Sequence, residues 1–203
     1  MPVRRPRGYF GEEHTTLGSD ILAVLKILKM PEQVLGKEEA DRLKTIQPDG
    51  WYPIEWLLGL MEILEAHVGP YGLMQMGRKL FQMSHKERVV QVAKSAHDIL
   101  YGIDGMYHHA NRGRGIGGWQ VLKFEPGLCE IEKNTAHHCI MEQGILTEAL
   151  LTVGCACNVT QTRCFRDGAD TCIYQITSAF VDQRWGEALP PGGGGTRRPA
   201  LPK

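Results

Sequence analysis

The sequence predicts an α+β fold in which an N-terminal helical layer packs on a C-terminal four-stranded antiparallel sheet with the order β-β-α-β-β. Two observations lead to this prediction. Apolar residues recur at helical spacing through the first half of the chain, and alternation with a period of two appears in two hairpins after residue 117. We expect one domain over residues 17–186, with its helical half at 17–105 and its sheet half at 117–180.

The first half is expected to hold four or five helices. Ser19 is a candidate N-cap for "DILAVLKILKM", and "KEEADRLKTI" is a short polar helix that the turn "QPDG" ends. Pro53 suits the first turn of the next helix, because its missing N–H costs little there. The pair "GP" at 69–70 ends that helix and begins another. Ser84 with Glu87 predicts a capping box for a last helix that reaches about residue 100.

The second half reads as two hairpins around one helix. The segment "GWQVLKF", the turn "EPG" and "LCEIEKN" predict the first hairpin, and "CIMEQGILTEALL" returns to helical spacing. The segments "CNVTQTRCF" and "TCIYQIT" predict the second hairpin around the turn "RDGAD". The glycines of "GMYHHANRGRGIGG" make the connection between the two halves a basic surface loop.

Composition and the chain ends limit the class of protein. Lys plus Arg equals Asp plus Glu, at 23 each, so no overall field recruits nucleic acid. No signal-peptide core and no apolar run of about 18 residues occurs, so we expect a cytoplasmic protein without a membrane span, whose thiols stay reduced. Residues 1–16 are expected to be flexible, and the Pro- and Gly-rich residues 187–203 to be disordered.

Five of the six cysteines lie between residues 137 and 172. Cys164 and Cys172 flank the turn of the second hairpin, and Cys139 begins the preceding helix, so three thiols can converge as zinc ligands do. Because no Cys-x₂-Cys pair is present, spacing alone favours small buried thiols instead. Cys129 alternates with acidic residues and is expected to face inward as an inert thiol.

The segment 139–176 resembles the 4-vinyl reductase-like domain, which recurs in aromatic-sensing bacterial regulators of the XylR and phenol-responsive type. The residues that carry the resemblance are Cys139, Gly144, Cys164, Gly168, Asp170 and Cys172. The wider fold group includes haem-based nitric oxide and oxygen sensors and transport-particle subunits. The resemblance implies helices and an antiparallel sheet around an internal pocket, which matches the order of elements above.

The resemblance also implies a zinc site held by Cys139, Cys164 and Cys172, with a glutamate three residues before the second cysteine. In this chain that position is Gln161, whose neutral amide is a poor zinc ligand. The fourth ligand is therefore open. The candidates are Gln161 itself, His138, Cys155 and Cys157, and a degenerate site without metal is the alternative.

Further candidates concern the pocket. Trp119 opens the first strand, where the aromatic sensors carry a pocket tryptophan, and His137 adjoins the cysteine helix. His108 and His109 are expected in the basic loop, as ligand contacts or as a solvated pair. The haem members carry a Tyr-x-Ser-x-Arg signature that "EKNTAHHC" lacks, which argues against a haem held in the same way.

These observations predict a sensory module rather than an enzyme, because no nucleophile elbow, phosphate loop or zinc-protease motif occurs. We expect this module to form a homodimer. Its ligand would be a small apolar or aromatic molecule in the pocket, with zinc in a structural role. Two alternatives stay open. One is a haem protein with a histidine axial ligand among those at 108, 109, 137 and 138, and the other is an accessory factor of tetrapyrrole metabolism.

Overall fold

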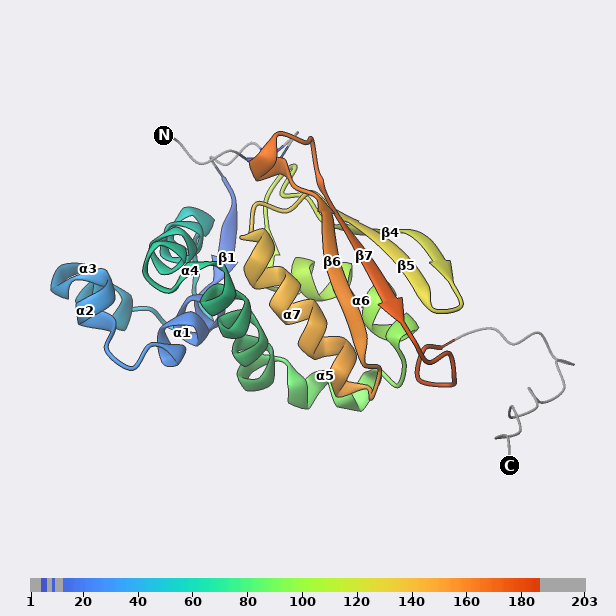
Figure 1. Ribbon diagram of the computed structural model, residues 1–203. Helices are drawn as coiled ribbons and strands as arrows, with labels where there is room; N and C mark the ends of the chain where they lie inside the picture. Colours follow the sequence, from blue (N-terminus) through green and yellow to red (C-terminus); the bar gives the residue numbers. More distant parts are fainter. Residues whose placement is uncertain (1–4, 7–8, 10–12, 187–203) are drawn as a thin grey trace, which may run out of the picture.

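The computed structural model describes residues 5–6, 9 and 13–186 (Figure 1). Residues 187–203, for which a disordered tail was expected, lie outside the described residues. The helices of the first half are α1 (Gly18–Ile27), α2 (Pro31–Leu35), α3 (Lys37–Lys44), α4 (Ile54–Ser84), α5 (Lys86–Val92) and α6 (Ala96–Ala110). The second half contains β4 (Trp119–Glu125), β5 (Leu128–Lys133), α7 (Cys139–Thr152), β6 (Cys157–Arg163), the 3₁₀ turn η1 (Phe165–Asp167) and β7 (Cys172–Ser178). The predicted fold class is confirmed.

The four strands of the second half form one antiparallel sheet in the order β4-β5-β7-β6. The two hairpins therefore join through their inner strands, β5 and β7. The register of that pair places Lys133 opposite Cys172. Side chains of β5 alternate between half-buried and buried, which puts Cys129, Ile131 and Lys133 on the inner face.

Helix α7 lies between the sheet and α4 (Figure 1). The two helices approach closely because glycines face each other across the contact. A Cβ atom on Gly77 would overlap the backbone carbonyl of Met141, and one on Gly144 would overlap that of Met74. Small residues at such a crossing let two helix backbones come closer than side chains would allow.

A second, smaller sheet was not predicted. It has the order β2-β1-β3 and is built from β1 (Thr15–Leu17), β2 (Trp51–Pro53) and β3 (Asn111–Arg112). Strands of two or three residues give no detectable alternation, so their sequence carries no strand signal. This sheet joins the start of the helical half to the end of α6.

Two predicted helix starts are wrong. Ser19 does not cap α1, which begins at Gly18, because the N–H groups of Gly18 and Ser19 donate to the carbonyls of Gly50 and Pro48. The turn 48–50 thus takes the place of a capping side chain.

The predicted break at Gly69 is confirmed, since this residue has a φ of +67° between two helical stretches.

The capping box falls eleven residues later than predicted. The helix proposed from Ser84 is interrupted after α5, and α6 begins with a box formed by Ser95 and Asp98. The Ser95 hydroxyl accepts from the Asp98 N–H at 3.2 Å, and the Asp98 carboxylate accepts from the Ser95 N–H at 3.1 Å. The next N–H group, on Ala96, donates to the carbonyl of Arg184, so a segment distant in sequence helps to fix this helix start.

His108 and His109 lie in the last turn of α6, not in a loop as expected. The helix continues because Tyr107 is buried and its hydroxyl donates to the carbonyl of Ile116 at 3.0 Å. No helix among the described residues is long and apolar enough to cross a membrane.

The contact between α4 and α7 yields a stability test. We expect Gly144→Ala to lower the free energy of unfolding by about 2–3 kcal/mol, because the added methyl group must push two helix backbones apart. Gly59→Ala on an open face of α4 is the matched control and should raise stability by up to about 1 kcal/mol. Urea denaturation measures both. A Gly144→Ala protein as stable as the original would show that the helices do not touch there.

Candidate functional site

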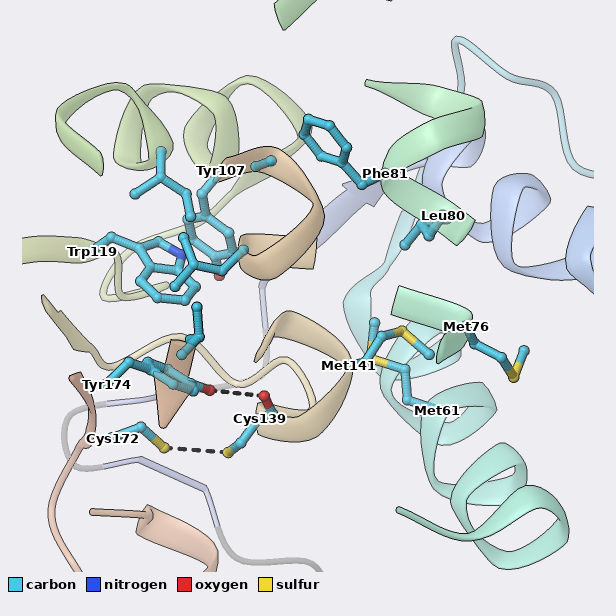
Figure 2. Packing of buried hydrophobic residues seen from close by; sticks show 14 of the residues in the cluster. Met61, Met76, Leu80, Phe81, Tyr107, Trp119, Cys139, Met141, Cys172 and Tyr174 are labelled. Atoms are coloured by element: carbon cyan, nitrogen blue, oxygen red, sulfur yellow. Dashed lines mark hydrogen bonds between the residues drawn. The ribbon is translucent and has the colours of Figure 1, made fainter. Parts of the chain in front are cut away.

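Three cysteine sulfurs meet where α7 starts and where the β6–β7 connection returns to the sheet. The Sγ atoms of Cys139 and Cys172 are 3.2 Å apart, and those of Cys164 and Cys139 are 3.5 Å apart. All three sulfurs lie within 4.8 Å of one another. Figure 2 shows Cys139 and Cys172 facing each other below Tyr174. Four sulfurs around zinc at about 2.3 Å would be about 3.8 Å apart, so this spacing is close to that of a tetrahedral thiolate site.

The backbone around the sulfurs is held in place by hydrogen bonds. The buried Tyr174 hydroxyl donates to the carbonyl of Cys139 at 2.8 Å (Figure 2). The Cys164 carbonyl accepts from the N–H groups of Asp167 and Ala169, each at 3.1 Å, which closes the turn before Cys172. Cys139 and Cys172 are fully buried, so solvent has little access to their sulfurs.

The three thiols differ in pKa. Hydrogen bonds from Cys164 and Cys172 to the sulfur of Cys139 lower the pKa of that thiol well below its ordinary value. The same contacts raise the pKa of Cys164 and Cys172. Cys139 is therefore the first of the three to become a thiolate, the form in which cysteine binds metals.

A buried cation lies beside the sulfurs. The Lys133 ammonium is fully buried, donates to the carbonyl of His137 at 2.6 Å and pairs with the carboxylate of Glu142. Burial alone would lower the pKa of Lys133, but the neighbouring Cys139 thiolate and Glu142 carboxylate raise it overall. The cation in turn stabilises negative charge on Cys139.

Sequence reasoning missed Lys133 and Glu142, although a signal for the lysine was present. The alternation that directs Cys129 and Ile131 inward directs Lys133 inward as well. A lysine at the end of a strand is normally read as solvated. For Glu142, one turn into α7, the sequence carries no comparable sign of burial.

Of the four candidates for a fourth ligand, the structure brings only Gln161 to the sulfurs. Its side chain lies close enough to Cys139 to lower the pKa of that thiol, and its Nε2 atom is buried without a regular hydrogen-bond partner. A half-turn of the amide exchanges Nε2 for Oε1, which can bind a cation. His138 instead points its Nε2 atom at Glu65, 3.0 Å away.

Cys155 and Cys157 are far from the three sulfurs. They lie at the beginning of β6, whereas Cys164 follows its end, and seven residues of strand span about 23 Å. The other group of potential metal ligands, formed by Glu62, Glu65 and His138, already contacts the guanidinium of Arg166, at 2.6 Å from Glu62 and 2.7 Å from Glu65.

A cavity lies between the helical half and the inner side of α7 and β4. Its volume is about 80 Å³. Its apolar wall consists of Val24, Leu57, Met61, Leu80, Ile103, Met106, Tyr107, Ala110, Trp119 and Ile145. Its polar wall consists of Asp20, His85, Asn111, His137 and Glu142. Trp119 and His137, predicted as ligand contacts, are in this wall, whereas His108 and His109 are not.

Two buried polar atoms of the cavity wall have no hydrogen-bond partner, namely Oδ1 of Asn111 and Nε2 of His137. The Asn111 amide nitrogen donates to the carbonyl of Tyr107 at 3.0 Å, which leaves its oxygen free. Nδ1 of His137 lies 3.2 Å from the Glu142 carboxylate, so Nε2 is an acceptor in the neutral ring. Burial raises the pKa of Asp20 and lowers that of His85 in the same wall.

Comparison with known proteins identifies the fold. An H-NOX protein from Shewanella oneidensis in the Fe(II) ligation state matches with a TM-score of 0.61 and 14% identity, over 82% of this chain and 98% of that one. The Fe(II) unliganded H-NOX protein from K. algicida matches with a TM-score of 0.59 and 13% identity, over 80% of this chain and 96% of that one. The chain thus has the H-NOX fold, as the resemblance to the wider fold group implied. No family model and no curated protein matches it.

The buried charges yield a second test. Lys133→Met should lower the free energy of unfolding by about 3–5 kcal/mol, because Glu142 would be left buried without its cation. Adding Glu142→Gln should recover much of that loss. Lys123→Met removes an exposed lysine that pairs with Glu125 at 3.0 Å, and should change stability by less than about 1 kcal/mol. Equal effects of the two lysine substitutions in urea denaturation would refute the role given to Lys133.

Proposed function

We propose that this chain is a non-catalytic small-molecule-binding module of the 4-vinyl reductase-like type, with a structural zinc at Cys139, Cys164 and Cys172. The observation that carries the ligand-binding role is the cavity with its two unpartnered polar atoms, on Asn111 and His137. Buried polar groups normally have partners, and an unpaired one costs about 1–3 kcal/mol. A bound molecule that supplies those partners would remove this cost.

The cavity wall indicates the chemistry of the ligand. The unpartnered atoms are acceptors, and Asp20 adds a carboxylate, so the ligand should carry a hydrogen-bond donor. No lysine or arginine is in the wall, which disfavours an anionic ligand. The volume suits a single ring, for which the flexible side chains of Met61 and Met106 can adapt. We therefore infer a phenol or an aromatic amine rather than an aromatic acid.

The zinc would fix the position of α7. Its three cysteines come from the start of the helix and from both sides of the β6–β7 connection, so the metal ties three chain segments together. Gln161 would complete the coordination through its amide oxygen or would hold a water in the fourth position. Because Glu142 and Ile145 of the same helix line the cavity, a fixed α7 also keeps the cavity in shape.

Haem, which the H-NOX comparisons raise, does not fit the residues present. The open volume of about 80 Å³ is well below the roughly 300 Å³ at which pockets for drug-sized molecules begin, and a porphyrin is larger still. The wall has no cation to receive propionates, and Asp20 and Glu142 would repel them. We therefore do not assign haem to this cavity.

The metal assignment has a direct test. Protein purified without added zinc should contain about one equivalent of zinc, and Cys164→Ser and Cys172→Ser should each lose it. Each should also lower the free energy of unfolding by several kcal/mol, against about 1 kcal/mol for an ordinary substitution. Cys157→Ser, at the far end of β6, should keep the metal. Gln161→Glu should bind zinc more tightly than the original, and Gln161→Leu more weakly.

Elemental analysis and chelator competition measure these effects. A zinc content below about a tenth of an equivalent in freshly purified protein would defeat the metal assignment.

The ligand assignment is tested by thermal unfolding with phenol, benzylamine and benzoate as ring-matched probes. Phenol or benzylamine should raise Tm in a concentration-dependent way, and benzoate should not. Asn111→Ala should reduce the shift, whereas Asn158→Ala, on the exposed face of β6, should not. Added haemin should give no stoichiometric Soret band. A Tm that responds to none of the ring probes, or a saturable haem complex, would contradict this assignment.

A further inference from the structure

Cys155 and Cys157 form a second thiol group at the opposite end of the sheet from the three-cysteine site. Their Sγ atoms are 3.3 Å apart. Cys155 is buried between the end of α7 and the start of β6, and Cys157, the first residue of β6, is half-buried. A pair of thiols at this distance can bind a metal or can be oxidised to a disulfide. Among the residues that the structure describes, no third histidine, cysteine or carboxylate ligand atom lies within 4.8 Å of both sulfurs.

A surface hollow borders the Cys155 side of this pair. The hollow is lined by Gly154, Cys155, Ala156, Ser178, Phe180 and Arg184, together with Asp182. The Cys155 sulfur lies 3.9 Å from the Ser178 hydroxyl, and the guanidinium of Arg184 is held near the rim by its ion pair with Asp182. In the three-cysteine site, Cys164 lines a separate hollow, whereas Cys139 and Cys172 are fully buried.

Of the two thiols, Cys155 loses its proton more readily. A hydrogen bond from Cys157 lowers the pKa of Cys155 to about 7, and burial opposes this only in part. The same contact raises the pKa of Cys157. For comparison, burial raises the pKa of the isolated Cys129 thiol to about 12. Near neutral pH Cys155 is thus partly a thiolate, which is the form that reacts with disulfides.

The two sulfurs are close enough for a small movement to join them. An S–S bond of about 2.05 Å requires them to approach by little more than 1 Å. Gly154, which precedes the pair, has a φ of +77° and can absorb a change of direction that other residues cannot. Only Ala156 separates the two cysteines in the sequence, and its small side chain is exposed, while the two sulfurs are in direct contact.

We propose that Cys155 and Cys157 are a reversible redox site. Small-molecule disulfides such as oxidised glutathione oxidise the pair to an intramolecular disulfide. The Cys155 thiolate attacks one sulfur of the oxidant, and one glutathione thiolate leaves and takes up a proton. Cys157 then loses its proton and attacks the Cys155 sulfur of the mixed disulfide, releasing the second glutathione. Overall, two protein thiols are oxidised to one disulfide, and one glutathione disulfide is reduced to two thiols.

This site is independent of the proposed zinc and ligand functions. About 23 Å of β6 separates it from Cys164, and it shares no residue with the cavity wall. Its oxidation would act on the strand end, where Cys157 pairs with Ser178 as the outermost residues of the β6–β7 ladder. The chain would thereby contain two cysteine sites, a buried cluster of three thiols and a pair that responds to the redox state of its surroundings.

The test uses the full-length protein at pH 7, equilibrated with a series of reduced-to-oxidised glutathione ratios. Free thiols are then blocked with N-ethylmaleimide, and the chain is cut with trypsin and a glutamate-specific protease. Cleavage after Glu148 and Arg163 gives the peptide 149–163, which contains Cys155 and Cys157 as its only cysteines. Its mass shows directly whether the pair is reduced, oxidised or joined to glutathione.

We expect this peptide to lose two hydrogen atoms and take up no maleimide at oxidising ratios, and to return to the dithiol with dithiothreitol. Cys157→Ser should stop the reaction at a glutathione adduct on Cys155. Cys155→Ser should slow adduct formation on Cys157 by about tenfold, because the thiol of lowered pKa is gone. Cys129→Ala is the matched control and should leave the oxidation of the pair unchanged.

Two results would overturn the proposal. One is a peptide that carries two maleimide groups at every glutathione ratio. The other is a peptide found only in disulfides to the peptides of Cys139, Cys164 or Cys172. Neither result depends on zinc or on a bound ligand, so the outcome is separable from that of the proposed function.

Discussion

The position of α7 is the constraint on which the rest of the structure depends. Glycines at 77 and 144 let this helix approach α4, and the sheet covers its other side. With both faces fixed, the helix places its first residue, Cys139, in the sulfur cluster and places Glu142 and Ile145 in the cavity wall. A displacement of α7 would therefore alter the three-cysteine cluster and the cavity together, because one helix carries residues of both.

Buried charge connects these two features. Lys133 lies between the Cys139 thiolate and the Glu142 carboxylate, and Nδ1 of His137, a residue of the cavity wall, lies 3.2 Å from Glu142. Each group is buried at a cost that only its neighbours offset. The polar atoms of the cavity and the charge at the sulfurs thus belong to one network. Through this network, a molecule bound in the cavity can change the electrostatics at the three cysteines.

The six cysteines of the chain lie in three kinds of surroundings. Cys129 is an isolated buried thiol with a raised pKa. Cys139 shares protons with two other thiols beside a buried cation. Cys155 has one thiol neighbour and an opening to solvent. Residue type alone does not separate these cases, since accessibility and neighbouring donors decide whether a thiol is inert, metal-binding or reactive.

The sequence by itself determined the fold class, both hairpins, α7 and the inward direction of Cys129, because these follow from local periodicity and from turns that act over a few residues. The convergence of the three cysteines was implied by the family resemblance, whereas spacing alone favoured separate buried thiols. Only the tertiary structure decided that His138 turns to Glu65, that Cys155 and Cys157 stand apart from the other thiols, and that α6 starts at Ser95. It also decided which polar atoms line the cavity. His138 and Glu65 are 73 residues apart in the sequence, and Ala96 and Arg184 are 88 apart. A single sequence does not encode such distant pairings in any local pattern.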